Sequence, residues 1–198
     1  MASRNPLQIK RLGSLALLLG GLWMAVVWLI YINAHGPTSY DELNTQFGRS
    51  TLFWGMMLGG PPNLLLALGL ILLKPQLIRP GKGRARAGYF LTLFGLVVPA
   101  VIDLAIRAIG PPFFLPILAI GLILLARGGA GNLLQGLDAR LLLINGLCLL
   151  ASMTLWLIPL DLFDQIEGYR IYGVLAHFIP GLVWAWLGLR FLQEKAAA

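Results

Sequence analysis

Long apolar stretches separated by short polar segments make up most of the chain. Six such stretches cover residues 12–32, 51–73, 88–109, 111–127, 139–160 and 170–192. Crossing a bilayer as a helix takes about 20 predominantly apolar residues, a length that five of the six reach. The stretch 111–127 is shorter, and at 1.5 Å per residue it covers roughly 25 Å. It can still cross if the membrane thins locally or if neighbouring helices cover its ends.

The composition agrees with this pattern. Hydrophobic residues make up 58% of the chain, charged residues only 12%, and the mean hydropathy is +0.81. A typical soluble domain has about 25% charged residues, roughly twice this share. The sequence therefore predicts an all-α polytopic integral membrane protein, a single bundle of six transmembrane helices over residues 1–198 with no soluble domain. Basic residues precede the first stretch, whose apolar run is too long for a cleaved signal peptide, so we expect it to remain as a signal anchor.

The basic residues fall on one side of the six predicted spans. Twelve of the 15 lie on that side, namely Arg4, Lys10, Arg11, Lys74, Arg79, Lys82, Arg84, Arg86, Arg127, Arg140, Arg190 and Lys195. The other side holds only Arg49, Arg107 and Arg170. Because loops rich in Lys and Arg stay in the cytoplasm, both termini are predicted to be cytoplasmic, in a bacterial or archaeal plasma membrane. We refer to the opposite side as the outer side.

The second span carries an interruption, LGGPPN, at residues 58–63. Proline has no N–H to donate, so Pro61 and Pro62 leave the carbonyls of Met57 and Leu58 without their helical partners. A new half-helix can begin at Pro61, with Gly59 and Gly60 as the joint. Two interpretations follow: a packed kink whose free carbonyls bond to neighbouring side chains, or the floor beneath an outer polar site. Just before the break, GMMLG (residues 55–59) is a GxxxG pattern that favours close packing inside the bundle or against a partner.

Polar residues within the spans are the candidate ligand-binding groups, because ionisable residues are costly in a membrane and usually face the protein interior. Asp103 and Arg107 have i,i+4 spacing and are expected to pair on one helix face. His177 is predicted at a depth similar to that of Asp103 and could pair with it, or bond to neighbouring backbone. Asn63 follows the double proline, and Asn145 lies within span five; either amide could hold helices together.

Catalytic signatures are absent from the sequence, which contains no GxSxG, HExxH, paired-cysteine or glycine-rich phosphate motif. We therefore expect no enzyme, no metal site and no cofactor. The only other histidine, His35, lies in the outer loop, so haem held by two histidines of one chain is not expected, although a partner chain could supply a ligand. The single cysteine, Cys148, excludes an internal disulfide.

The basic loop between spans two and three lies at the membrane surface. Its cations are expected to bind anionic lipid headgroups rather than nucleic acid, namely Lys74, Arg79, Lys82, Arg84 and Arg86. Three functional hypotheses remain. The leading one is a small-solute binding or transport protein with a polar site in the outer half of the bundle. The alternative is a non-catalytic accessory or structural subunit of a larger membrane complex, with partner subunits or a homo-oligomer. An intramembrane enzyme has the least support.

Overall fold

The computed structural model describes residues 5–36, 42–78, 83–110, 112–128, 134–157 and 166–194. Within these ranges the chain is helical and contains no strand, only isolated bridges. The elements in chain order are α1 (Pro6–Ala34), α2 (Thr51–Gly59), α3 (Pro61–Leu77), α4 (Gly83–Ile106), η1 (Pro112–Phe114), α5 (Leu115–Arg127), α6 (Leu137–Leu157), α7 (Ile166–Gly173), the π-helix η2 (Val174–Phe178) and α8 (Ile179–Gln193). The predicted all-helical class is confirmed.

Five helical segments of the described chain are long and apolar enough to cross a membrane. They are Pro6–Ala34, Thr51–Leu77, Gly83–Ile106, Leu137–Leu155 and Glu167–Gln193, and Pro112–Arg127 is a shorter apolar helix. Two of these segments are interrupted: Thr51–Leu77 consists of α2 and α3 with a break at Gly60, and Glu167–Gln193 contains α7 and α8 with η2 between them. The structure therefore supports five to six spanning helices, in the order that the hydrophobic pattern predicts.

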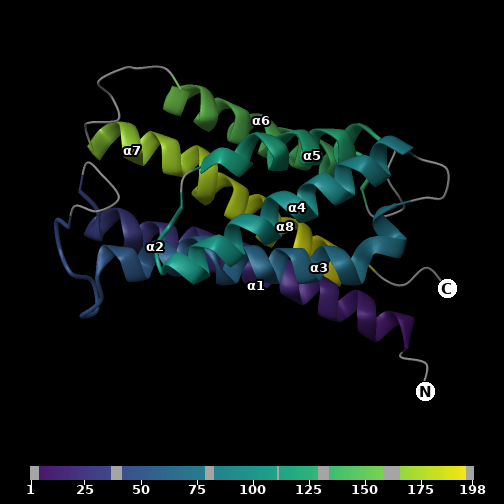
Figure 1. Cartoon of the computed structure of the whole chain (residues 1–198). Coiled ribbons are helices and arrows are strands. Elements are labelled where there is room, and N and C mark those ends of the chain that lie inside the picture. The colour runs from purple at the N-terminus through teal and green to yellow at the C-terminus, as the bar shows by residue number, and fades with distance from the viewer. Residues whose placement is uncertain are drawn as a thin grey trace.

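The helices form a ring that closes on itself. On one side α1 packs closely against both α3 and α8, and on the other α5 packs closely against α4 and α6. Smaller contacts of α3 with α4, and of α6 with α8, join the two groups (Figure 1). Both ends of the chain lie at the same end of the bundle, where Lys10 Nζ is 3.2 Å from Glu194 Oε2.

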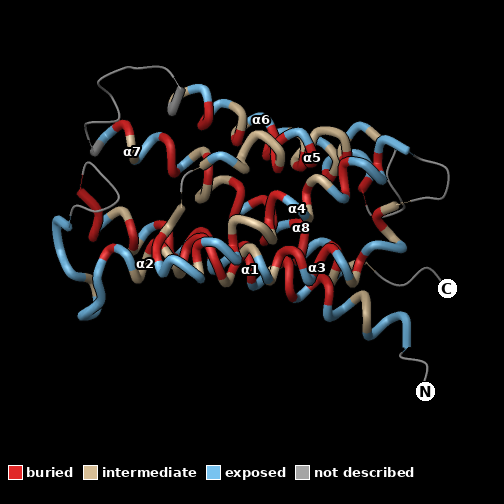
Figure 2. The backbone as a smooth tube through the Cα atoms, in the orientation of Figure 1, coloured by how far each residue is buried: buried red, intermediate tan, exposed pale blue. Residues whose placement is uncertain are grey.

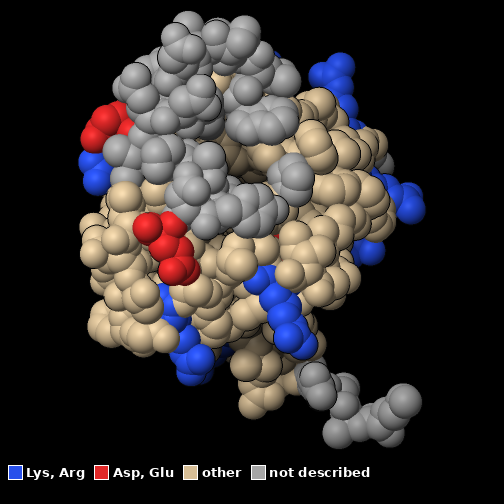
Figure 3. Space-filling view, turned by 60° about the vertical axis from the view of Figure 1, so that its left-hand side comes forward, with Lys and Arg blue, Asp and Glu red and all other residues tan. Residues whose placement is uncertain are grey.

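Burial follows this arrangement. Buried residues line the contacts between helices, whereas the outward faces of the same helices are exposed (Figure 2). Many exposed side chains are large and apolar, including Leu19, Val26 and Val101, each at least half accessible. On the face shown in Figure 3, charged side chains form small separate groups and most of the described surface carries neither sign of charge. An apolar exterior of this kind fits contact with lipid rather than with water.

The interruption of the second span is a kink, and one of the carbonyls that the prolines leave free has a donor. Gly60 donates its N–H to the Met56 carbonyl at 2.9 Å, and α3 begins at Pro61. The Met57 carbonyl, which Pro61 leaves without a donor, accepts a hydrogen bond from the indole Nε1 of Trp23 at 3.0 Å. This outcome matches the first interpretation for that carbonyl, a bond from a neighbouring side chain.

The Trp23 bond provides a test of the kink. We expect Trp23→Phe to lower the free energy of unfolding by about 1 kcal/mol, because the Met57 carbonyl loses its donor. In a Pro61→Ala background residue 61 regains an N–H for that carbonyl, so Trp23→Phe should cost less than half as much. Unfolding in mixed micelles measures both differences. Equal losses in the two backgrounds would show that the indole stabilises the helix by packing alone.

Candidate functional site

A cavity lies at the centre of the ring and is lined by residues from all of the apolar helices. Its volume is about 70 Å³. The polar lining residues are Asn63, Asp103, Asn145, Tyr172 and His177, and most of the others are apolar or aromatic. Neither Lys nor Arg is among the described residues of the lining. Space of this size holds several water molecules or a solute of a few non-hydrogen atoms.

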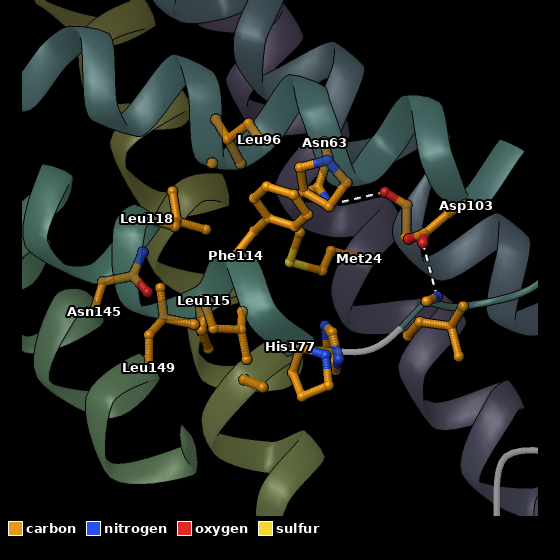
Figure 4. Close-up of a pocket in the computed structure, with 18 of the residues that line it drawn as sticks. Met24, Asn63, Leu96, Asp103, Phe114, Leu115, Leu118, Asn145, Leu149 and His177 are labelled. Carbon is orange, nitrogen blue, oxygen red and sulfur yellow. Dashed lines mark hydrogen bonds between the residues drawn. The ribbon is translucent and has the colours of Figure 1, made fainter. Parts of the chain in front are cut away.

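Asp103 forms one end of the cavity. It is 5% exposed, and its Oδ1 accepts a hydrogen bond from the Gly110 N–H at 2.7 Å (Figure 4). The helix α4 ends at Ile106, and Arg107 adopts a left-handed backbone conformation with φ of 57°. The Ala108 N–H then bonds to the Asp103 carbonyl at 3.2 Å. The carboxylate thus holds the segment after α4 against the end of its own helix.

The predicted pair of Asp103 with Arg107 is wrong. The i,i+4 spacing places two residues on one face only while the helix continues, and Arg107 lies beyond its last residue. Arg107 is exposed, and it takes part in neither of the ion pairs found within the described residues. The buried carboxylate of Asp103 therefore has no basic side chain as a partner in the described part of the chain.

The joint of the second span meets this carboxylate directly. Gly59 has no side chain, and a Cβ built there would overlap Asp103 Oδ2. Asn63, one turn later, donates from Nδ2 to the Gly59 carbonyl at 2.7 Å. Gly55, the other glycine of GMMLG, lies close to Ile109 in the segment after α4. Both glycines of the motif are therefore used inside the bundle, against α4 and the residues that follow it.

Asn145 brings a complete amide into the apolar part of the cavity. It is 0% exposed, and neither its Nδ2 nor its Oδ1 has a hydrogen-bond partner within the described residues. Figure 4 shows its side chain at the opposite end of the pocket from Asp103, close to Leu118, Leu115 and Leu149. Leaving a buried amide unsatisfied costs about 1–3 kcal/mol, so a polar group that bonded to it here would be stabilised.

His177 lies in η2 and also lines the cavity. Its Nε2 is buried without a partner in the described chain, so the possible pairing with Asp103 is not formed. The π-helix precedes Pro180, which cannot donate to the preceding turn, and single π-turns of this kind occur often at functional sites. The Trp28 ring packs directly on Gly173 and lies 5.6 Å from the imidazole, measured between ring centroids.

His35 lies at the start of the loop to which the sequence assigned it, and it is buried. It directly follows α1 and is 0% exposed, with its ring stacked on Tyr169 at 4.1 Å between centroids. Tyr31 and Trp28 continue this aromatic contact toward His177. No group of three or more His, Cys, Asp or Glu residues that could hold a metal occurs within the described ranges.

The basic residues assigned to lipid headgroups are partly described. Lys74 and Arg86 lie over the ring of the exposed Phe90, at 5.5 and 5.9 Å from its centroid, and Arg84 is exposed nearby in sequence. Arg79 and Lys82 lie outside the described residues. The structure thus brings two of the five cations together around one aromatic ring, and their contact with lipid stays a prediction.

Comparison with known proteins adds no assignment. No protein-family model matches the chain, and neither a curated protein nor a solved structure gives a significant match.

Proposed function

We propose that the protein binds a small polar solute in the central cavity and participates in its transport across a membrane. The observation that carries this proposal is that the amide of Asn145 and the Nε2 of His177, both in one cavity, have no hydrogen-bond partner among the described residues. Evolution of a merely packed bundle would favour apolar residues at such positions, since an unsatisfied buried polar atom lowers stability. Ligand pockets combine an apolar wall with a few polar groups in the same way.

The arrangement of the helices supports a solute site. The cavity lies where two closely packed groups of helices meet through smaller contacts, α3 with α4 and α6 with α8. Relative movement of such groups is a common basis for alternating access, and interrupted helices often line the site in transporters. Here the breaks at Gly60 and η2 both border the cavity. The charge asymmetry of the loops further supports cytoplasmic termini and a plasma-membrane location.

The alternative function is an accessory or structural subunit, for which GMMLG could have been the surface that contacts a partner helix. Gly55 and Gly59 of this motif are covered by the chain itself, so they do not support that function. The solute site is therefore the better-supported proposal.

Asn145→Leu tests the proposal. Leucine has a similar size and removes both unsatisfied amide atoms, so we expect the free energy of unfolding to rise by about 1 kcal/mol while solute binding is lost. Thermal unfolding of the purified chain, with and without a panel of small alcohols, amines and carboxylates, measures both effects.

The matched control is Asn33→Leu, which changes an exposed asparagine that bonds to the Leu29 carbonyl and does not line the cavity. It should leave ligand-induced shifts unchanged. A wild-type chain that responds to no member of the panel would contradict solute binding. Unaltered shifts in Asn145→Leu would place the solute elsewhere.

A further inference from the structure

We infer that the solute is a small primary amine in its protonated form, bound with its ammonium group at the Asp103 end of the cavity. This inference rests on the proposed solute site and names its substrate class. It follows from the charge of the lining, from the hydrogen-bond acceptors beside Asp103, and from the separation of the polar groups along the cavity.

The charge of the lining is negative. Asp103 is the only lining residue among those described that carries a formal charge at neutral pH with histidine neutral, and Arg107 lies outside the cavity. Asp103 also belongs to the last turn of α4, where the helix dipole already places partial negative charge. A carboxylate at this position is stabilised by a cation and would repel an anionic solute.

A second acceptor, the Gly59 carbonyl, lies at the same end. The Gly59 carbonyl bonds to the Asn63 amide at 2.7 Å and retains a second lone pair, and Gly59 itself lies against Asp103 Oδ2. An ammonium group donates three hydrogen bonds and accepts none, so it suits a cluster of carboxylate and carbonyl oxygens. The break in the second span thereby contributes to the site.

The rest of the cavity selects an organic cation over a metal ion. A single carboxylate is a poor set of ligands for a divalent metal, which takes several oxygen ligands. Apart from Asn63, Tyr172 and His177, the rest of the lining is mostly apolar or aromatic, with Phe114 and Trp184 among its members. Carbon atoms of a short chain can pack there. The unpartnered amide of Asn145 then binds a hydrogen-bonding group at the other end of the solute.

Three series of probes with equal chain lengths test this class on the full chain in lipid nanodiscs. The cationic probes are 2-aminoethanol, 3-aminopropan-1-ol and 4-aminobutan-1-ol. The neutral probes are the corresponding diols, and the anionic probes are the corresponding hydroxy acids. We expect calorimetric titration to show the tightest binding for one of the amino alcohols, at least tenfold weaker binding for its diol, and no binding for its hydroxy acid.

Asp103→Asn tests whether the ammonium group binds at the Asp103 carboxylate. Asparagine keeps an acceptor for the Gly110 N–H and removes the charge, so the affinity for the amino alcohol should fall at least tenfold while that for the diol stays within threefold. Glu167→Gln is the matched control, because this carboxylate is exposed, pairs with Arg170 at 2.8 Å and does not line the cavity. It should leave both affinities unchanged.

The outcomes separate the two proposals. If diols bind as tightly as amino alcohols, the cavity remains a solute site but the amine is excluded. If Asp103→Asn changes neither affinity, the ammonium group does not bind at the Asp103 end. NaCl and KCl are compared with each other at the same ionic strength. If either salt displaces the amino alcohol competitively in the titration, the site is one for an inorganic cation. If no probe of any charge binds the wild-type chain, the solute site itself is overturned. Because the probe series is measured on the wild-type chain, it decides the class even if Asp103→Asn does not fold.

Discussion

Gly21→Val is expected to destabilise the protein by roughly 3 kcal/mol, because overpacking at an interface that cannot open is costly. Gly21 lies in α1 where this helix meets α8. A Cβ at this position would overlap the backbone N of Ala185 and lie 2.5 Å from the Gly181 carbonyl oxygen. Both are backbone atoms of a helix, so neither can rotate away as a side-chain end could. The two helices would have to separate.

Separation of α1 from α8 affects more than one contact. Gly181 faces α1 in the same way, with a built Cβ 2.8 Å from the Gly21 carbonyl oxygen, and buried Trp184 follows it on α8. α8 also continues from η2, which carries His177 into the cavity. We therefore expect Gly21→Val to weaken binding of a solute in the cavity as well as folding.

Gly83→Val is the matched control for Gly21→Val. Gly83 begins α4, and a Cβ built there meets no atom of the described chain within 4 Å. The substitution is the same in chemistry and also falls within a helix, so its effect should stay within about 0.5 kcal/mol. Thermal and micellar unfolding measure both variants. A similar loss at both positions would mean that helix propensity, rather than helix contact, determines the cost.

The hydrophobic pattern predicted the helices because each depends on local sequence alone. A run of apolar residues long enough to cross a bilayer has to satisfy its own backbone hydrogen bonds, and a helix does this within the segment. The pattern could not give the helix ends. α1 begins at Pro6, six residues before the apolar stretch, because Asn5 accepts the Leu7 N–H and caps a helix whose first turns are polar.

At α4 the apolar stretch extends beyond the end of the helix, whereas at α1 the helix begins before the apolar stretch. Residues 107–109 continue the apolar span in sequence, but the helix stops at Ile106. What ends it is a contact between residues seven apart, the Gly110 N–H with the Asp103 side chain. Hydropathy contains no information about such a bond. For this reason the expected pairing of Asp103 with Arg107 failed, although the position of Asp103 at a polar site remains consistent with the prediction.

The cavity shows what depends on tertiary structure. Asn63, Asp103 and His177 were predicted as site residues, and the structure brings all three to one cavity, whereas Arg107 lies outside it. Asn145 was interpreted only as an amide between helices. Its signal was present, a strong hydrogen-bonding group in the middle of an apolar run, but only the three-dimensional structure shows that no partner meets it among the described residues.

The second large effect is expected from Gly59→Ala, measured in a double-mutant cycle with Asp103→Ala. Gly59→Ala alone should cost roughly 2–3 kcal/mol, because its Cβ would occupy the place of Asp103 Oδ2. The carboxylate cannot turn aside freely, since its Oδ1 holds the Gly110 N–H at 2.7 Å. Displacing it therefore also releases the segment after α4. This cost exceeds the gain of up to about 1 kcal/mol that alanine brings over glycine within a helix.

Asp103→Ala is destabilising by itself, because it leaves the Gly110 N–H without its acceptor, and the cycle subtracts this loss. In that background the clash is absent, so Gly59→Ala should become neutral or mildly stabilising, with a coupling energy of at least about 1.5 kcal/mol. Gly55 lies one turn earlier, and a Cβ built there is 3.1 Å from the backbone N of Ile109. Gly55→Ala should therefore show no comparable coupling with Asp103→Ala. Additive effects of Gly59→Ala and Asp103→Ala would mean that the break of the second span and the carboxylate are independent, and that the kink does not shape the Asp103 end of the cavity.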